Sequence, residues 1–272
     1  MATIAQARRE ALRRLNGSAG TKRTMAHQES RVNMRGIAAA AVVLIVAASA
    51  LAQPPVPMTA CVGLPAVVAG ASADESEIAC DGARAAFAFF APLDLRPLPG
   101  LTIELSMSLP AGAPSDAVAC FVIPQRRIIV LRYEPFSWHR SWFGLAADKR
   151  LYRAVIAHEV AHAIVACHAG EPRLSFAAQE YIAYVAMIAT MPEEHRRELL
   201  ALHPGSGFDN VVQINEFAYA FNPARFAAES YRHCIRQPDP RASLRRVLDG
   251  GLLQGLGGYR TRAAQRSWIR DR

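Results

Sequence analysis

Residues 148–191 read DKRLYRAVIAHEVAHAIVACHAGEPRLSFAAQEYIAYVAMIATM, and the expected fold is built around the helices that this segment predicts. Asp148 is a favoured helix N-cap residue and Gly170 is a typical residue after a helix end, so the first half predicts a helix that runs to about residue 169. Ser175 predicts the N-cap of a second helix over 176–191, which ends before a proline. A turn between the two helices would fold the second back against the first.

The first helix carries an HExxH motif, His158-Glu159-Val160-Ala161-His162. Residues four apart lie on one face of a helix, so both imidazoles can reach one zinc ion, whereas Glu159 lies about 100° around the helix and can address a water. With 8 His in 272 residues, the number of such motifs expected by chance is about 0.01. The sequence therefore predicts a metal site.

Two residues compete as the third ligand. His168 stands where a three-histidine pattern, HExxHxxGxxH, would place its last histidine. That pattern needs a glycine that lets the chain turn back, and Val165 occupies this position. On a continuous helix His168 would lie about 240° around from His162 and could not share its ion.

Glu180 is the second candidate, and we favour it. It is the only charged residue of the apolar segment 176–191, and a carboxylate in such surroundings needs a cation or strong donors. It would complete a two-histidine, one-glutamate site with water in the fourth place. The alternative is an ion pair of Glu180 with Arg153 or Arg173.

The motif and the downstream Glu180 resemble the zincin metallopeptidases, specifically the glutamate-ligand branch, the gluzincins. The resemblance covers roughly residues 100–191 and extends to uncharacterised secreted bacterial proteins with an HExxH motif. It implies a peptidase fold, a zinc ion held by His158, His162 and Glu180, and a peptide or protein substrate. Many gluzincins have an aspartate four residues after the glutamate ligand, where this chain has Tyr184.

The implied reaction is zinc-assisted hydrolysis in which Glu159 acts as the general base. Tyr184 is a candidate for orienting a ligand. Candidates for stabilising the transition state are Tyr231 and His233, with Tyr219 and His203 as further options. The alternative function is a catalytically silent binding module of the periplasm that keeps the same fold. Because metal ligation does not need Glu159, its presence favours the enzyme.

The rest of the chain predicts an α+β, zincin-like fold over residues 53–258. A small, mostly antiparallel sheet precedes the active-site helix, and a mainly helical half follows it. The sequence patterns predict a helix over 76–91, strands over 101–109, 120–123 and 127–133, and further helices beginning at Pro192, Asn222 and Arg241.

The amino-terminal segment predicts export. The net charge is +8, and residues 1–52 hold most of the excess, so the nearly balanced remainder does not favour a nucleic-acid partner. Residues 34–52 predict a signal peptide, with an apolar run over 37–52 and cleavage after Ala52. Residues 1–33 are then an over-early start or a basic extension before a retained anchor. We expect a periplasmic or secreted protein without a stable membrane span after cleavage.

The basic tail over 259–272 and the cysteines complete the sequence. We interpret the tail as a solvated terminus, with contact to anionic lipid or nucleic acid as the alternative. The chain has 5 Cys and no CxxC pair, so the pattern does not support a thiolate zinc site. Cys61 and Cys80 form a plausible local disulfide, although five cysteines allow many arrangements.

Overall fold

A computed structural model describes residues 56–95, 98–113, 117–122, 125–169 and 174–250. These residues belong to the compact unit Gln53–Arg272. The expected extension, signal peptide and basic tail lie outside the described residues. In the described part of the chain, no helix combines the length and the apolar character needed to cross a bilayer.

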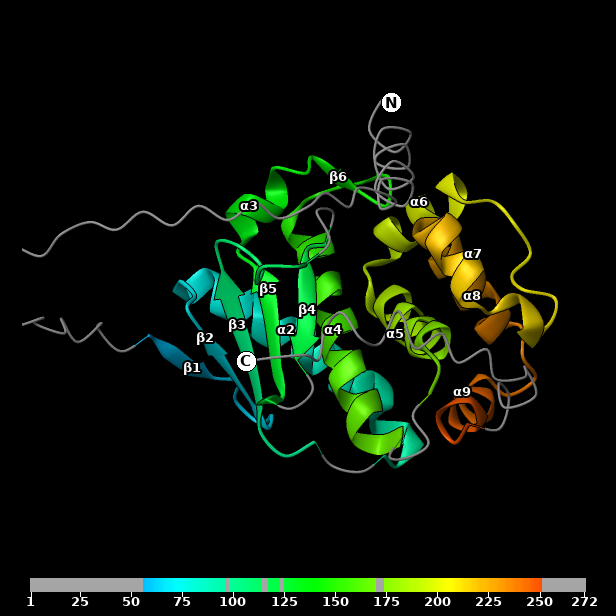
Figure 1. Cartoon of the computed structure of the whole chain (residues 1–272), viewed down its shortest axis with the longest axis horizontal. Helices are drawn as coiled ribbons and strands as arrows, with labels where there is room; N and C mark the ends of the chain where they lie inside the picture. The colour runs from blue at the N-terminus through cyan, green and yellow to red at the C-terminus, as the bar shows by residue number, and fades with distance from the viewer. Residues whose placement is uncertain (1–55, 96–97, 114–116, 123–124, 170–173, 251–272) are drawn as a thin grey trace, which may run out of the picture. The chain divides into compact units, whose positions relative to one another are not determined.

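A five-stranded sheet forms the first half (Figure 1). Its strands follow the order β1-β2-β3-β5-β4, in which the central pairs β2–β3 and β3–β5 are parallel and the outer pairs are antiparallel. The bounds are β1 (Met58–Ala60), β2 (Ala66–Ala69), β3 (Leu101–Ser106), β4 (Ala119–Val122) and β5 (Arg127–Leu131).

The expected α+β class is confirmed, but the sheet is mixed rather than mostly antiparallel. The sequence patterns did not predict β1 and β2, which are three and four residues long. Helix α2 (Ala73–Phe90) connects β2 to β3, and a helical crossover makes the two strands that it joins parallel. The strands predicted over 120–123 and 127–133 are present as β4 and β5, which pair antiparallel.

Helix α2 is anchored at both of its sides. The predicted disulfide between Cys61 and Cys80 is confirmed and ties α2 to the segment after β1. On its other side α2 packs against the HExxH helix α4 (Lys149–Ala169), and Gly82 makes this approach possible. A Cβ atom at Gly82 would lie only 2.7 Å from the Arg153 carbonyl oxygen and 2.9 Å from Ile156 Cβ.

Helices form the second half, as predicted. Helix α5 (Phe176–Thr190) packs between α4 and α8, and the N-cap side chains Ser175, Asn222 and Asp239 each accept a backbone hydrogen bond at the start of a helix. The other bounds are α6 (Glu193–Leu202), α7 (Glu216–Phe221), α8 (Pro223–Ile235) and α9 (Pro240–Leu248).

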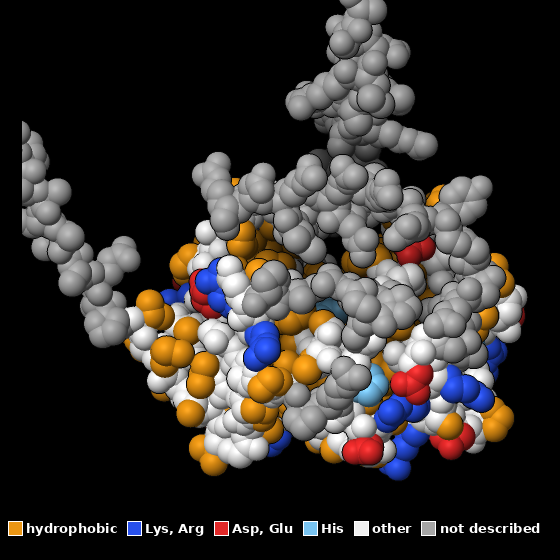
Figure 2. All heavy atoms as spheres, turned by 60° about the horizontal axis from the view of Figure 1, so that its bottom comes forward, with side chains coloured by type: hydrophobic (Ala, Val, Ile, Leu, Met, Phe, Trp, Pro, Cys, Tyr) orange, Lys and Arg blue, Asp and Glu red, His pale blue; other side chains and the backbone are white. Residues whose placement is uncertain are grey.

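Besides β1 and β2, the sequence patterns did not predict α7, α3 or a small hairpin. Helix α3 (Tyr133–Ser137) falls where the third strand was expected to end, and the small hairpin of β6 (Ser141–Trp142) and β7 (Leu145–Ala146) follows it before α4 begins. Figure 2 shows one face of the molecule, on which side chains of both charge signs are interspersed on the side of the C-terminal helices.

Candidate metal centre

The HExxH helix is fixed at its beginning. Asp148 Oδ1 accepts a hydrogen bond of 2.8 Å from the Leu151 backbone N–H, which confirms the predicted cap. The Tyr152 hydroxyl donates to the Leu131 carbonyl oxygen at 2.7 Å and so joins α4 to β5. Because α4 is continuous through residue 169, His158 and His162 lie one turn apart on the face that meets α5.

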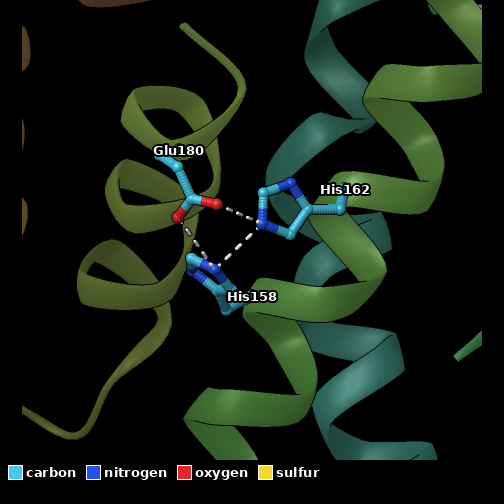
Figure 3. Close-up of side chains that lie close together, drawn as sticks. All are labelled: His158, His162 and Glu180. Atoms are coloured by element: carbon cyan, nitrogen blue, oxygen red, sulfur yellow. Dashed lines mark hydrogen bonds and ion pairs between the residues drawn. The ribbon is translucent and has the colours of Figure 1, made fainter. Parts of the chain in front are cut away.

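Helix α5 brings Glu180 to the same place (Figure 3). Glu180 Oε1 lies 3.4 Å from His162 Nε2, and Glu180 Oε2 lies 3.6 Å from His158 Nε2. The two Nε2 atoms are 3.0 Å apart. The three ligand atoms lie within 4.8 Å of one another, a grouping able to hold a metal ion.

The alternative third ligand, His168, and the alternative ion-pair partner of Glu180, Arg153, contact other residues. His168 Nε2 lies 3.5 Å from Asp249 Oδ1 at the end of α9, and Arg153 donates to the Thr190 carbonyl oxygen at 3.0 Å. Arg173 lies outside the described residues. The structure therefore brings Glu180, and not His168, to the histidine pair.

Burial sets the protonation of this group. His158 and Glu180 are each 6% exposed. Burial lowers the pKa of His162 to about 4, and burial together with His162 holds the pKa of His158 well below its ordinary value. Burial and the charge of Glu159 raise the pKa of Glu180 to about 8. Both rings are therefore neutral at pH 7, which is the state that binds a metal.

The surroundings of one atom, Glu180 Oε2, are evidence for a metal site. Glu180 Oε2 is buried and accepts no hydrogen bond, although a buried carboxylate oxygen normally has a donor or a cation. Two imidazoles and one carboxylate form a donor set that suits zinc. The residues present therefore fit a zinc ion.

Glu159 lies beside the group rather than in it. Its side chain is buried, and burial raises its pKa to about 8. Its charge acts on Glu180, as stated above, and also on Cys120 of β4, whose pKa is raised to about 11 by burial first and by Glu159 second. The Glu159 side chain thus lies close enough to both Glu180 and Cys120 to influence their pKa values.

Tyr184 packs against the histidine pair, and Tyr219 packs against Tyr184. The ring centroid of Tyr184 lies 4.4 Å from that of His158. Burial raises the pKa of Tyr184 well above its ordinary value, and the charge of Glu180 and a hydrogen bond with Tyr219 add to this. Tyr219 of α7 also contacts Phe176, one turn before Glu180 on α5. Tyr219 therefore covers the face of α5 that carries Glu180.

The other candidates have different surroundings. His233 Nδ1 lies 2.9 Å from the Tyr181 hydroxyl, and His233 Nε2 lies 3.2 Å from Gln237 Nε2, so the structure engages this ring away from the metal group. Tyr231 is a partly buried side chain packed against the hydrophobic core. His203 Nε2 lies 3.3 Å from the Phe143 carbonyl oxygen.

The sequence analysis did not single out Phe143. This residue lies at the tip of the β6–β7 hairpin, and its ring centroid is 5.6 Å from that of Tyr184. The only signal in the sequence is the adjacent pair Trp142-Phe143 before a glycine, which could have indicated an aromatic turn.

The profile of DUF6639, a family of unknown function, matches residues 66–255. The chain belongs to this family. The matched residues include the sheet from β2 onward, the HExxH helix α4 and Glu180. No curated protein and no solved structure matches the chain.

Proposed function

We propose that this protein is a zinc-dependent hydrolase, and specifically a peptidase. The observation that carries the proposal is the convergence of His158, His162 and Glu180, in which a buried carboxylate oxygen has no hydrogen-bond donor. The adjacent Glu159 supports catalysis over a purely structural metal site, because metal ligation does not require it.

A zinc ion held by these three residues would supply Lewis acidity and lower the pKa of a bound water to about 7. Glu159 accepts the proton of the attacking water and passes it to the leaving nitrogen. Tyr184, whose ring packs against that of His158, is the candidate for stabilising the developing oxyanion.

The substitution Glu159→Gln tests the proposal. It keeps the shape of the side chain and removes the proton acceptor, so hydrolysis should fall by roughly 10²–10⁴-fold while the zinc content is retained. The measurement combines metal analysis with cleavage of a diverse peptide library. Glu198→Gln, at an exposed position of α6, is the matched control and should keep both zinc and activity.

Two results would contradict the peptidase proposal. A zinc-loaded parent that cleaves no peptide would favour the silent binding module. Equal cleavage by the parent and by Glu159→Gln would assign the activity to another site or to a contaminant.

We further propose that the protein works in an oxidising compartment, periplasmic or extracellular. The Cys61–Cys80 disulfide supports this location, because disulfides persist in such compartments and are rare in the cytosol.

A further inference from the structure

The tip of the β6–β7 hairpin holds a bulky aromatic residue in an unfavourable backbone conformation. Trp142 pairs with Leu145, so Phe143 and Gly144 form a two-residue loop. Their φ angles are 58° and 84°. Loops with two positive φ angles strongly prefer Asn-Gly or Gly-Gly, and a side chain as large as phenylalanine is rare at the first position. Such an outlier at the edge of a candidate active site indicates a functional role for the ring.

The surroundings of the hairpin hold this conformation in place. The Phe143 carbonyl oxygen lies 3.3 Å from His203 Nε2. Gly144 packs so closely against α6 that a Cβ atom there would lie 3.0 Å from Leu202 Cδ1. The rings of Trp142 and Phe143 stack with centroids 3.8 Å apart and planes within 5° of parallel. The two rings are therefore presented as one rigid surface.

The surface of Trp142 and Phe143 contacts Tyr184, and Tyr184 contacts His158 of the metal group (His158, His162 and Glu180). The Phe143 ring lies 5.6 Å from the Tyr184 ring, which in turn lies 4.4 Å from the His158 ring. Exposure rises along this series, because His158 and Tyr184 are buried whereas Phe143 and Trp142 are partly exposed. An extended peptide advances about 3.3 Å per residue, so the partly exposed rings lie within about three residues of a bond held at the metal group.

We propose that Phe143 and Trp142 form a substrate subsite that accepts an aromatic or large aliphatic side chain, an inference that rests on the proposed peptidase function. Flat, rigid aromatic rings bind such side chains by stacking and by removing apolar surface from water. They offer no compensation for the desolvation of a charged side chain. The subsite therefore selects peptides that carry Phe, Tyr, Leu or Met within three residues of the cleaved bond.

The test uses Phe143→Asn, because asparagine is favoured at this left-handed position and the substitution removes the ring without disturbing the turn. Trp138→Ala is the control, since Trp138 is 66% exposed and precedes the hairpin. The substrates are matched peptides with Phe, Leu, Ala or Asp at each of the three positions on either side of the bond. The parent should prefer Phe and Leu at one position, and Phe143→Asn should reduce kcat/KM for those peptides by roughly 10- to 200-fold while the Ala peptide changes little.

A binding measurement separates this inference from the proposed function. In the Glu159→Gln background, the Phe peptide should bind at least tenfold more tightly than the Ala peptide in titration calorimetry, and Phe143→Asn should abolish the difference. Equal losses for all four peptides would overturn the subsite and make Phe143 a positioning residue for Tyr184. Binding without any preference would also overturn it, whereas preferential binding by a parent that cleaves nothing would contradict only the peptidase proposal.

Discussion

Glu75 and Glu180 are two buried glutamates of the same chain in opposite electrostatic situations. Glu75 is 8% exposed and Glu180 is 6% exposed. Glu75 accepts hydrogen bonds from Arg132 Nη2 at 2.6 Å, from the Ser72 hydroxyl at 2.9 Å and from the Tyr133 backbone N–H at 3.1 Å. Burial alone would raise its pKa, but these donors outweigh burial and lower the pKa to about 2.

Glu180 has no comparable donors. Two neutral imidazoles face it, one of its oxygens accepts no hydrogen bond, and burial raises its pKa to about 8. The fold thus provides a cation for the glutamate that joins α2 to the end of β5, and provides none for the glutamate beside the HExxH motif. This contrast supports the proposal that Glu180 binds a cation from solution, and three predictions test it.

The largest effect is expected from the double substitution of His158 and His162 by alanine. Removing both imidazoles leaves a single carboxylate, which cannot hold zinc alone. Metal analysis of the purified protein should show a fall from about one zinc per chain to a background level. His195→Asn is the control, because His195 is also buried but is bonded to Asp148 at 3.0 Å. If the double variant retained the zinc of the parent, the metal would be bound elsewhere.

The next effect contrasts the two glutamates directly. Glu180→Gln should weaken zinc binding by at least the 10- to 100-fold that loss of an outer partner of a ligand costs, and at pH 6.5, where the Glu180 carboxyl is protonated, it should leave the metal-free protein as stable as the parent. Glu75→Gln should keep the zinc affinity and lower the free energy of unfolding by roughly 2–3 kcal/mol, because it removes charge-assisted hydrogen bonds. Competition with a chelator and urea titration measure the two quantities.

His168→Ala is the matched control for the ligand assignment. Because His168 pairs with Asp249, this substitution should leave the zinc affinity unchanged. A large loss of zinc in this variant with none in Glu180→Gln would exchange the roles of the two residues.

The third effect is a pH dependence of the metal-free protein. The pKa values of Glu159 and Glu180 are about 8 in the folded state and about 4.3 in an unfolded chain. The folded state therefore binds more protons, and stability falls as the pH rises from 6.5 to 8. The lowered pKa values of His158 and His162 act in the opposite direction, but only below about pH 6.5, where unfolded histidine still titrates.

Urea midpoints at pH 6.5 and 8 measure this dependence. The metal-free parent should unfold more easily at pH 8, the decrease should be smaller in Glu180→Gln, and saturating zinc should remove it because zinc binds the ionised carboxylate. The stabilisation from Glu75 is present above pH 4.5 and is lost only as the pH falls toward 2, so Glu75→Gln should not change this window. A metal-free protein equally stable at both pH values would contradict the electrostatic description of Glu180.

The elements that the sequence predicted were those with local signals. Asp148 and Ser175 cap their helices through residues three positions away, and the histidine pair follows from helix periodicity alone. Glu180 could be predicted to lie near the histidine pair because it is the only charged residue in an apolar helix. Cys61 and Cys80 could be paired because they are close in the chain.

The remaining features depend on contacts between distant segments. Strands β1 and β2 are too short to show an alternating pattern. The contact of Tyr219 with Tyr184 depends on how α7 packs against α5, and no local pattern encodes such packing. His233 looked equivalent to other candidates by residue type, and only its bond to Tyr181 shows where it is engaged.

The close approach at Gly82 makes the positions of His158 and His162 depend on a residue that touches neither of them. The backbone of α2 lies directly against Arg153 and Ile156, and His158 follows two residues later on the same helix. Metal sites work only within about 0.5 Å of their productive geometry, which is less than the shift that one methyl group at position 82 would impose. The alignment of the two histidines with Glu180 therefore depends on the face of α2 that meets α4, and a side chain at position 82 would disturb it.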